Sequence, residues 1–115
     1  EETNIGSIGF SIMRQFNQAE FKLGFPVIDK KFIEYLILFQ KKIKDINIKI
    51  IEITSKDEMQ ITTGEGWRVF FDPSSDVNLQ ITKLKLLLEA NFPTENSRKN
   101  LQYIDLSSGD KAYYK

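Results

Sequence analysis

Few of the side chains that commonly take part in catalysis are present in this sequence. Of these, the carboxylates are the plausible candidates. The 115 residues include no cysteine and no histidine. This excludes a thiol nucleophile, a Ser-His-Asp triad, an imidazole acid–base group and an ordinary zinc site. General acid–base catalysis would have to use carboxylates, of which Asp72, Asp76 and Asp105 are the candidate set.

The positions of these three carboxylates favour structural roles. General acid–base catalysis needs two carboxyl groups in unlike environments, and nothing in this spacing predicts such a pair. Asp72 is expected to end a strand, Asp76 to cap a helix, and Asp105 to lie on the face of a strand. We therefore predict no catalytic residue.

Two short motifs resemble ligand sites in part. The segment Gly64-Glu65-Gly66 has glycine spacing, but it lacks the G-x-x-x-x-G-K-[ST] pattern of a phosphate loop and leads into a strand. We interpret it as a hairpin turn. Asp72 and Asp76 do not match an EF-hand, which needs about twelve residues of patterned oxygen ligands. The sequence therefore predicts no metal and no cofactor.

Aromatic and basic residues also have ordinary interpretations. Trp67 could stack on a ligand, but an aromatic residue on the same strand face as Val69 and Phe71 is more typical of a core. The basic residues Arg98, Lys99 and Lys42 are scattered, as expected for a solvated surface. The formal net charge is zero, which argues against nucleic-acid binding, because phosphate contacts require a basic excess.

The elements that must position these residues begin with a strand region and a helix. Ile8, Phe10 and Ile12 recur at every second position, and a second apolar pair near Phe21 indicates a hairpin. Asp29 is then a candidate N-cap for an amphipathic helix of about four turns. Its expected apolar stripe consists of Phe32, Ile33, Leu36, Ile37, Phe39, Ile43 and Ile46.

Three strands and a second helix follow. In the β-branched run 46–54, apolar residues recur at every second position until the pattern breaks between Ile50 and Ile51. This break indicates either a bulge or a strand that is apolar on both faces. Strands around 59–62 and 67–72 complete an antiparallel meander across the glycine turn. A start signal at 73–76 predicts a helix that ends near Asn91 and Pro93.

The last part of the chain predicts a surface loop over 94–100 and a hairpin formed by 101–106 and 111–115. Two helices with one apolar stripe each need a sheet face to cover. We therefore predict one α+β domain spanning 1–115, with one largely antiparallel sheet and both helices packed on it. The final strand has no successor in this sequence, so one of its edges is either open to a partner strand or protected by its lysines.

The sequence also indicates what kind of chain this is. No stretch approaches the roughly 18 consecutive apolar residues of a membrane helix. Residue 1 is not Met and no signal peptide is visible. We expect a soluble fragment or a mature form, with any membrane anchor of the parent protein left out of this sequence.

Three segments carry a family resemblance. They are Leu23-Gly24-Phe25-Pro26-Val27-Ile28 before the first helix, Gly66–Asp72 before the second, and Leu101–Leu106 followed by a turn and Lys111–Lys115. Their order and spacing resemble the β domain of the FtsQ/DivIB family of bacterial cell-division proteins. That domain has an "L-P-x-I" segment before its helix and closes with "Y-I-D-L-R-F-x-x-K-V-Y-Y-K". The resemblance covers roughly 23–115, and 1–22 match loosely.

The resemblance implies a function and a location. Members of this family are non-enzymatic scaffolds of septal cell-wall synthesis with a membrane helix, a POTRA domain and then this β domain outside the membrane. The β domain binds the FtsB/FtsL (DivIC/FtsL) pair, whose strand adds to the sheet edge at the last strands. The implied partner-binding residues in this sequence are Ser108, Gly109, Lys111, Ala112, Tyr113, Tyr114 and Lys115.

This sequence departs from the family pattern at one point of the implied contact. The family usually has Arg and an aromatic residue after Asp-Leu, where this chain has Ser107 and Ser108. Ala112 likewise stands where Val is usual. Arginine and aromatic side chains often dominate interface energy, so the departure predicts a weaker contact.

Two alternative functions remain open from the sequence. One is a ligand-binding or carboxylate-dependent enzymatic domain that uses the sheet near Trp67, and it requires a pocket with at least two converging acids. The other is a POTRA-like protein-recognition module. The strand triplet between the two helices argues against the POTRA order of strand, two helices and two strands.

Overall fold

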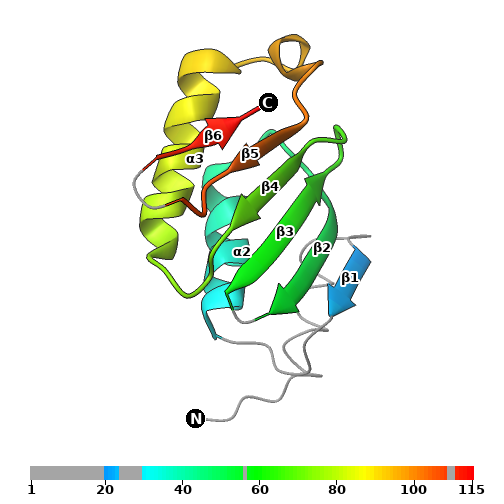
Figure 1. The fold of residues 1–115 in the computed structure, drawn as a ribbon. Helices are drawn as coiled ribbons and strands as arrows, with labels where there is room; N and C mark the ends of the chain where they lie inside the picture. The colour runs from blue at the N-terminus through cyan, green and yellow to red at the C-terminus, as the bar shows by residue number, and fades with distance from the viewer. Residues whose placement is uncertain (1–19, 24–29, 56, 109–110) are drawn as a thin grey trace.

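Two helices separate three groups of strands along the chain, and the helices and strands assemble into two layers (Figure 1). The computed structural model describes residues 20–23, 30–55, 57–108 and 111–115. The elements in that part are β1 (Glu20–Leu23), α2 (Lys30–Lys42), β2 (Ile48–Ser55), β3 (Glu58–Thr63), β4 (Arg68–Phe71), α3 (Val77–Asn91), the 3₁₀ turn η1 (Asn96–Arg98), β5 (Tyr103–Asp105) and β6 (Tyr113–Tyr114).

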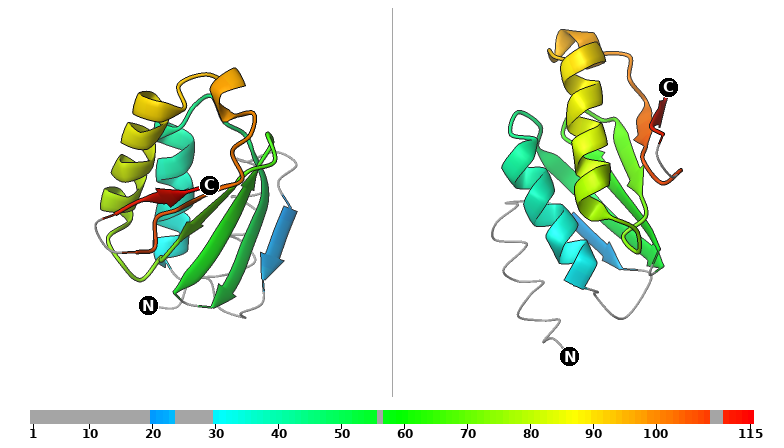
Figure 2. Two further views of the ribbon diagram at one scale, coloured as in Figure 1. Left: turned by 45° about the horizontal axis from the view of Figure 1, so that its top comes forward. Right: turned by 90° about the vertical axis from the view of Figure 1, so that its left-hand side faces the viewer.

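The described strands form one six-stranded sheet in the order β1-β2-β3-β4-β5-β6. Strands joined by turns are antiparallel, namely β2–β3, β3–β4 and β5–β6. The two pairs joined through a helix, β1–β2 and β4–β5, are parallel, because a crossover returns the chain to the same end of the sheet. Both helices cover one face of the sheet (Figure 2). The prediction of an α+β fold with one largely antiparallel sheet is confirmed.

The core lies between the helices and the covered face of the sheet. Alternate residues of the strands point into it, and each helix contributes one stripe, as the periodicity predicted. Burial of these side chains supplies the main drive for folding. The most deeply buried strand residues are Ile51, Ile53, Met59, Ile61, Val69, Phe71 and Ile104, and they meet Phe32, Tyr35, Leu36, Phe39, Ile81 and Leu84 from the helices.

The irregular alternation in β2 is caused by a bulge. Ile48 pairs with Thr63 and Ile50 pairs with Thr62, so the register shifts by one residue between them. The extra residue lets Ile48 and Ile51 both point into the core, where each is buried. This shift supports the bulge interpretation, but it lies between Ile48 and Ile50, before the predicted slip between Ile50 and Ile51.

Helix α2 is shorter than its apolar pattern predicted. It ends at Lys42, and Ile43 and Ile46 are buried by the turn that follows it. Ile37, expected in the apolar stripe, is 40% exposed, whereas Tyr35 is fully buried and stacks on the ring of Phe71. The stripe is rotated from its predicted position because the aromatic side chains fill more of the space above the sheet.

Helix α3 begins and ends as predicted. The side chain of Asp76 accepts a hydrogen bond from the amide of Leu79 at 3.1 Å, as an N-cap does. The amide of Phe92 donates to the carbonyl of Leu88 and closes the last turn. Between these ends, buried Gln80 donates to the backbone carbonyl of Asp72 at 2.7 Å, which ties the helix start to the end of β4.

Part of the predicted N-terminal structure lies outside the described residues. This applies to the strand expected around 8–13 and to the Asp29 cap. The second apolar pair, near Phe21, falls in β1, which pairs in parallel with β2. In the part that the structure describes, no helix is long and apolar enough to span a membrane.

Candidate partner-binding edge

The final two strands form the predicted hairpin at one end of the sheet. Ile104 on β5 faces Tyr114 on β6 in antiparallel register. The amide of Lys115 donates to the carbonyl of Tyr103 at 3.1 Å, and the amide of Tyr103 donates back to the carbonyl of Lys115 at 3.2 Å. Within the described part of the chain, β6 is the last strand, and the right view of Figure 2 looks onto its edge.

The hydrogen-bond pattern of this hairpin decides which backbone groups face outward. Opposed residues in an antiparallel pair alternate between hydrogen-bonded and non-hydrogen-bonded positions. Lys115 is bonded to β5, and Tyr113 occupies the next bonded position opposite Asp105. The N–H and C=O of Tyr114 therefore point away from the sheet, and alternation places those of Ala112 the same way. Such groups can pair with an added strand.

The two faces of β6 differ in their surroundings. Tyr114 lies on the helix side, where its ring meets the ring of Phe92 edge-on with centroids 5.2 Å apart. The side chain of Asn91 donates to the Tyr114 hydroxyl at 3.5 Å. Ala112 is half-buried on the same side, whereas Tyr114 is 49% exposed, close to the 51% of Tyr113 on the outer face. The edge is thus anchored on one face and open on the other.

Helix α3 also holds the segment that leads into β6. The ammonium group of Lys83 donates to the carbonyl of Lys111 at 3.1 Å and to that of Leu106 at 3.4 Å. The Ser107 hydroxyl donates to Asp105 Oδ1 at 2.6 Å on the other side of the turn. Both stems of the hairpin are therefore fixed by side chains.

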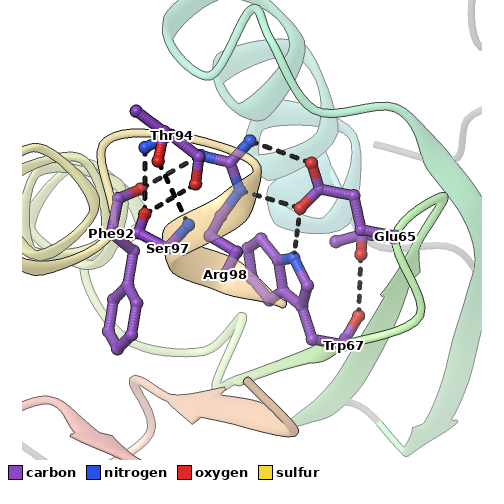
Figure 3. A network of polar contacts seen from close by, with 7 residues as sticks. Glu65, Trp67, Phe92, Thr94, Ser97 and Arg98 are labelled. Atoms are coloured by element: carbon purple, nitrogen blue, oxygen red, sulfur yellow. Dashed lines mark hydrogen bonds and ion pairs between the residues drawn. The ribbon is translucent and has the colours of Figure 1, made fainter. Parts of the chain in front are cut away.

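An internal ion pair fixes the loop that precedes β5 (Figure 3). Arg98 donates from Nε and Nη2 to the two carboxylate oxygens of Glu65, at 2.7 and 2.8 Å. Its Nη1 donates to the carbonyl of Phe92 at 3.0 Å, and the indole N–H of Trp67 donates to Glu65 Oε1 at 2.7 Å. We call this group of four residues the Arg98 latch. It joins the β3–β4 turn, the end of α3 and η1.

The prediction that Arg98 is a solvated surface residue is wrong. Its side chain is 7% exposed and that of Glu65 is 18% exposed, although the turn carrying Glu65 lies at the surface. The bidentate hydrogen bond from Arg98 is the main cause that lowers the pKa of Glu65, and the same bond raises the pKa of Arg98. The two residues lie 33 positions apart, so no local pattern could have paired them.

The three candidate catalytic carboxylates are each engaged locally. The side chain of Asp72 accepts hydrogen bonds from Ser74 and Ser75, and Asp76 caps α3. Asp105 accepts from the amide and hydroxyl of Ser107. Such bonds within a turn or cap are the structural roles that the sequence favoured.

Asp72 and Asp105 nevertheless line one hollow of about 430 Å³ at the start of β3 and the end of β4, together with Asp57 and Glu58. Trp67, around which a ligand site was considered, lies apart from this hollow and is 1% exposed in the core. In the described ranges, no group of three or more acidic side chains has the geometry of a metal site. The alternative of a ligand-stacking site at Trp67 is therefore not supported, because this side chain is buried.

The glycine turn has the role that the sequence predicted. The amide of Gly66 donates to the carbonyl of Thr63 at 3.0 Å, and the amide of Thr63 donates to the carbonyl of Trp67. Gly66 has a φ of 101°, which side chains with a Cβ rarely adopt. The turn closes the β3–β4 hairpin and presents Glu65 to Arg98.

The structure brings five of the seven implied partner-binding residues together at the β6 edge. Lys111, Ala112, Tyr113, Tyr114 and Lys115 form one extended segment there. Ser108 is exposed at the hairpin turn, and Gly109 lies outside the described residues. Sequence reasoning missed the anchors of this segment, Lys83 and Phe92.

Comparison with known proteins adds no family assignment. No family model matches the chain, and no curated protein matches its sequence.

Proposed function

We propose that this chain is a non-enzymatic scaffold domain that binds partner proteins by accepting a strand at the β6 edge. The observation that carries the proposal is the outward direction of the Tyr114 N–H and C=O at the end of the sheet. Added strands use such groups for affinity, and neighbouring side chains for specificity. The preformed, anchored edge favours binding because little ordering is needed.

Within this proposal, the resemblance to the FtsQ/DivIB family names the setting. The domain would act on the extracytoplasmic side of a bacterial membrane and bind FtsB/DivIC-type and FtsL-type division proteins during septal cell-wall synthesis. Support comes from the closing motif around Tyr103 and Tyr114, which folds as an antiparallel hairpin at a sheet end. The absence of basic excess in the composition supports a protein partner over a nucleic acid.

The test is an NMR titration of the labelled domain with the soluble extracytoplasmic segment of an FtsB/DivIC-type partner. Shifts concentrated on 109–115 are expected, and binding that leaves these amides unchanged would exclude the proposed site. Ala112→Pro should block pairing, because it removes an outward N–H without touching a β5–β6 bond. Ala112→Val is the matched control that should retain binding.

A second pair of variants tests the departure from the family pattern. Ser107→Arg and Ser108→Phe restore the side-chain types that usually follow Asp-Leu, and both positions are exposed. We expect the double variant to bind the partner more tightly than the natural chain, by up to about tenfold. Equal affinity would mean that the backbone edge alone sets the interaction.

A further inference from the structure

We infer that the strand received at β6 carries one acidic residue between two apolar residues, placed opposite Tyr113. This inference rests on the proposed function, because it names the chemistry of the segment that pairs with the edge. It follows from the side chains that line the two faces of β6, which differ in charge and in their contacts with α3.

The outer face of the edge carries two free positive charges. Lys111, Tyr113 and Lys115 alternate along the segment and lie on the face of Asp105, which is opposite Tyr113. Both lysines are exposed, and neither forms an ion pair within the described part of the chain. Lysines at a sheet edge disfavour pairing with a strand that is neutral or positively charged.

The positions of these charges favour an acidic residue at one position of the added strand. A residue opposite Tyr113 on an added strand has Lys111 and Lys115 as its two diagonal neighbours, within reach of long side chains. The carboxylate of Asp105, opposite Tyr113 and one strand further in, accepts hydrogen bonds from Ser107 at Oδ1. An acidic side chain at this position therefore meets two ammonium groups, whereas a basic one is repelled by both.

The helix face of the edge is apolar. Tyr114 and half-buried Ala112 point to this side, and Tyr114 rests on the ring of Phe92. Leu79 and Leu86 on α3 are 48% and 60% exposed. They lie one turn before and one turn after Lys83, which anchors the Lys111 carbonyl, on a side of α3 turned away from its buried stripe. Residues of an added strand that point to the helix face of the edge would lie next to the Tyr114 ring and Ala112.

Three synthetic peptides test the inference directly. Each is an acetylated and amidated twelve-residue strand whose centre reads Val-Glu-Val, Val-Gln-Val or Val-Lys-Val, in an otherwise identical Ser/Thr context. Amide shifts on 111–115 of the labelled domain report the site, and their concentration dependence gives the Kd. The Glu peptide should bind roughly three- to tenfold more tightly than the Lys peptide, as two diagonal ion pairs allow.

A charge-reversed domain provides the control. In the Lys111→Glu/Lys115→Glu variant the order of the peptides should reverse. The Lys44→Glu/Lys49→Glu variant makes the same charge change at two exposed positions on the α2–β2 side and should keep the natural order. An unchanged set of core amide signals in both variants verifies that the fold is retained.

The outcomes separate this inference from the proposed function. If the peptides pair with β6 but bind equally well, or if the Lys peptide is preferred, strand addition stands and the acidic preference is overturned. If no peptide shifts the β6 amides, the lysines protect the edge, and both proposals fail. Shifts confined to α3 would show that the leucines bind apolar segments without strand pairing, which also overturns the inference.

Discussion

Replacing Arg98 by Met should destabilise the domain more than any single exposed-charge change. Methionine keeps much of the buried stem but removes two bonds to Glu65 and one to the carbonyl of Phe92. Breaking a buried pair costs about 3–5 kcal/mol, because the partner is left uncompensated. The Glu65 side chain is 18% exposed and can be partly rehydrated, so we expect a loss of about 2–4 kcal/mol.

Chemical denaturation measures this loss, with Lys99→Met as the matched control. Lys99 follows Arg98 directly and is exposed, so its variant should stay within about 0.5 kcal/mol of the natural chain. A double-mutant cycle with Glu65→Gln should give a coupling energy of about 1–3 kcal/mol. If Arg98→Met also stays within 0.5 kcal/mol, or if the two losses simply add, the latch contributes no interaction energy and the reasoning is refuted.

The same cycle has a predictable pH dependence. The folded-state pKa of Glu65 is lowered, mainly by the hydrogen bond from Arg98. Its stabilising contribution is therefore complete above the unfolded pKa, about 4.3, and is lost as the pH falls through the lowered folded value. The stability difference between the natural chain and Glu65→Gln should shrink as the pH falls below about 4. A difference that stays constant down to pH 2 would contradict this assignment.

Hydrogen exchange should show where the latch acts. The loop after η1 leads to Gln102, whose carbonyl accepts from the amide of Arg68 and whose amide donates to Lys115 at 2.6 Å. In Arg98→Met, the amides of β5 and β6 should lose more protection than those of β2 and β3, because their anchor is gone. Uniform loss across the sheet would mean that the latch stabilises the whole domain and has no special effect on the edge.

Four further substitutions have defined outcomes in thermal or chemical unfolding. Gly66→Ala should cost about 1–2 kcal/mol because of its φ of 101°, whereas Gly64→Ala should be nearly neutral, since its Cβ would meet the nearest atom at an ordinary 3.5 Å. Tyr35→Phe should stabilise the fold by about 1 kcal/mol, because the buried hydroxyl has no hydrogen-bond partner among the described residues. Burial also raises the pKa of Tyr35, so the variant should lose less stability than the natural chain above about pH 10. Asp76→Ala should cost about 1 kcal/mol through loss of the N-cap bond, and an unchanged midpoint would contradict that role.

Local patterns were sufficient for most of the fold. The β2–β3–β4 meander, the Asp76 cap, the glycine turn and the final hairpin all follow from residues close together in sequence. Turn chemistry, capping and side-chain periodicity act over a few residues, so they can be read without knowing the tertiary partners. The α+β class followed because two one-sided helices need a sheet to cover.

The end of α2 and the makeup of its buried stripe depended on packing. Ile43 and Ile46 continue the helical spacing but lie after the last helical residue, and Tyr35 replaces Ile37 in the core. Periodicity identifies apolar positions, but it does not measure how much volume the facing sheet must receive. The ring of Phe71 occupies that space and selects an aromatic partner.

Some features of the candidate edge could likewise be predicted from the sequence, and others depended on the tertiary structure. That 101–106 and 111–115 would form a hairpin could be read from the sequence, because a turn separates the two segments. The direction of the Tyr114 N–H and C=O, the Lys83 anchor and the Arg98–Glu65 pair required the tertiary structure. These features depend on hydrogen-bond register and on contacts between residues 23 to 33 positions apart. Charge and hydrophobicity along the chain carry no information about such pairings, because packing of the whole domain brings the groups together.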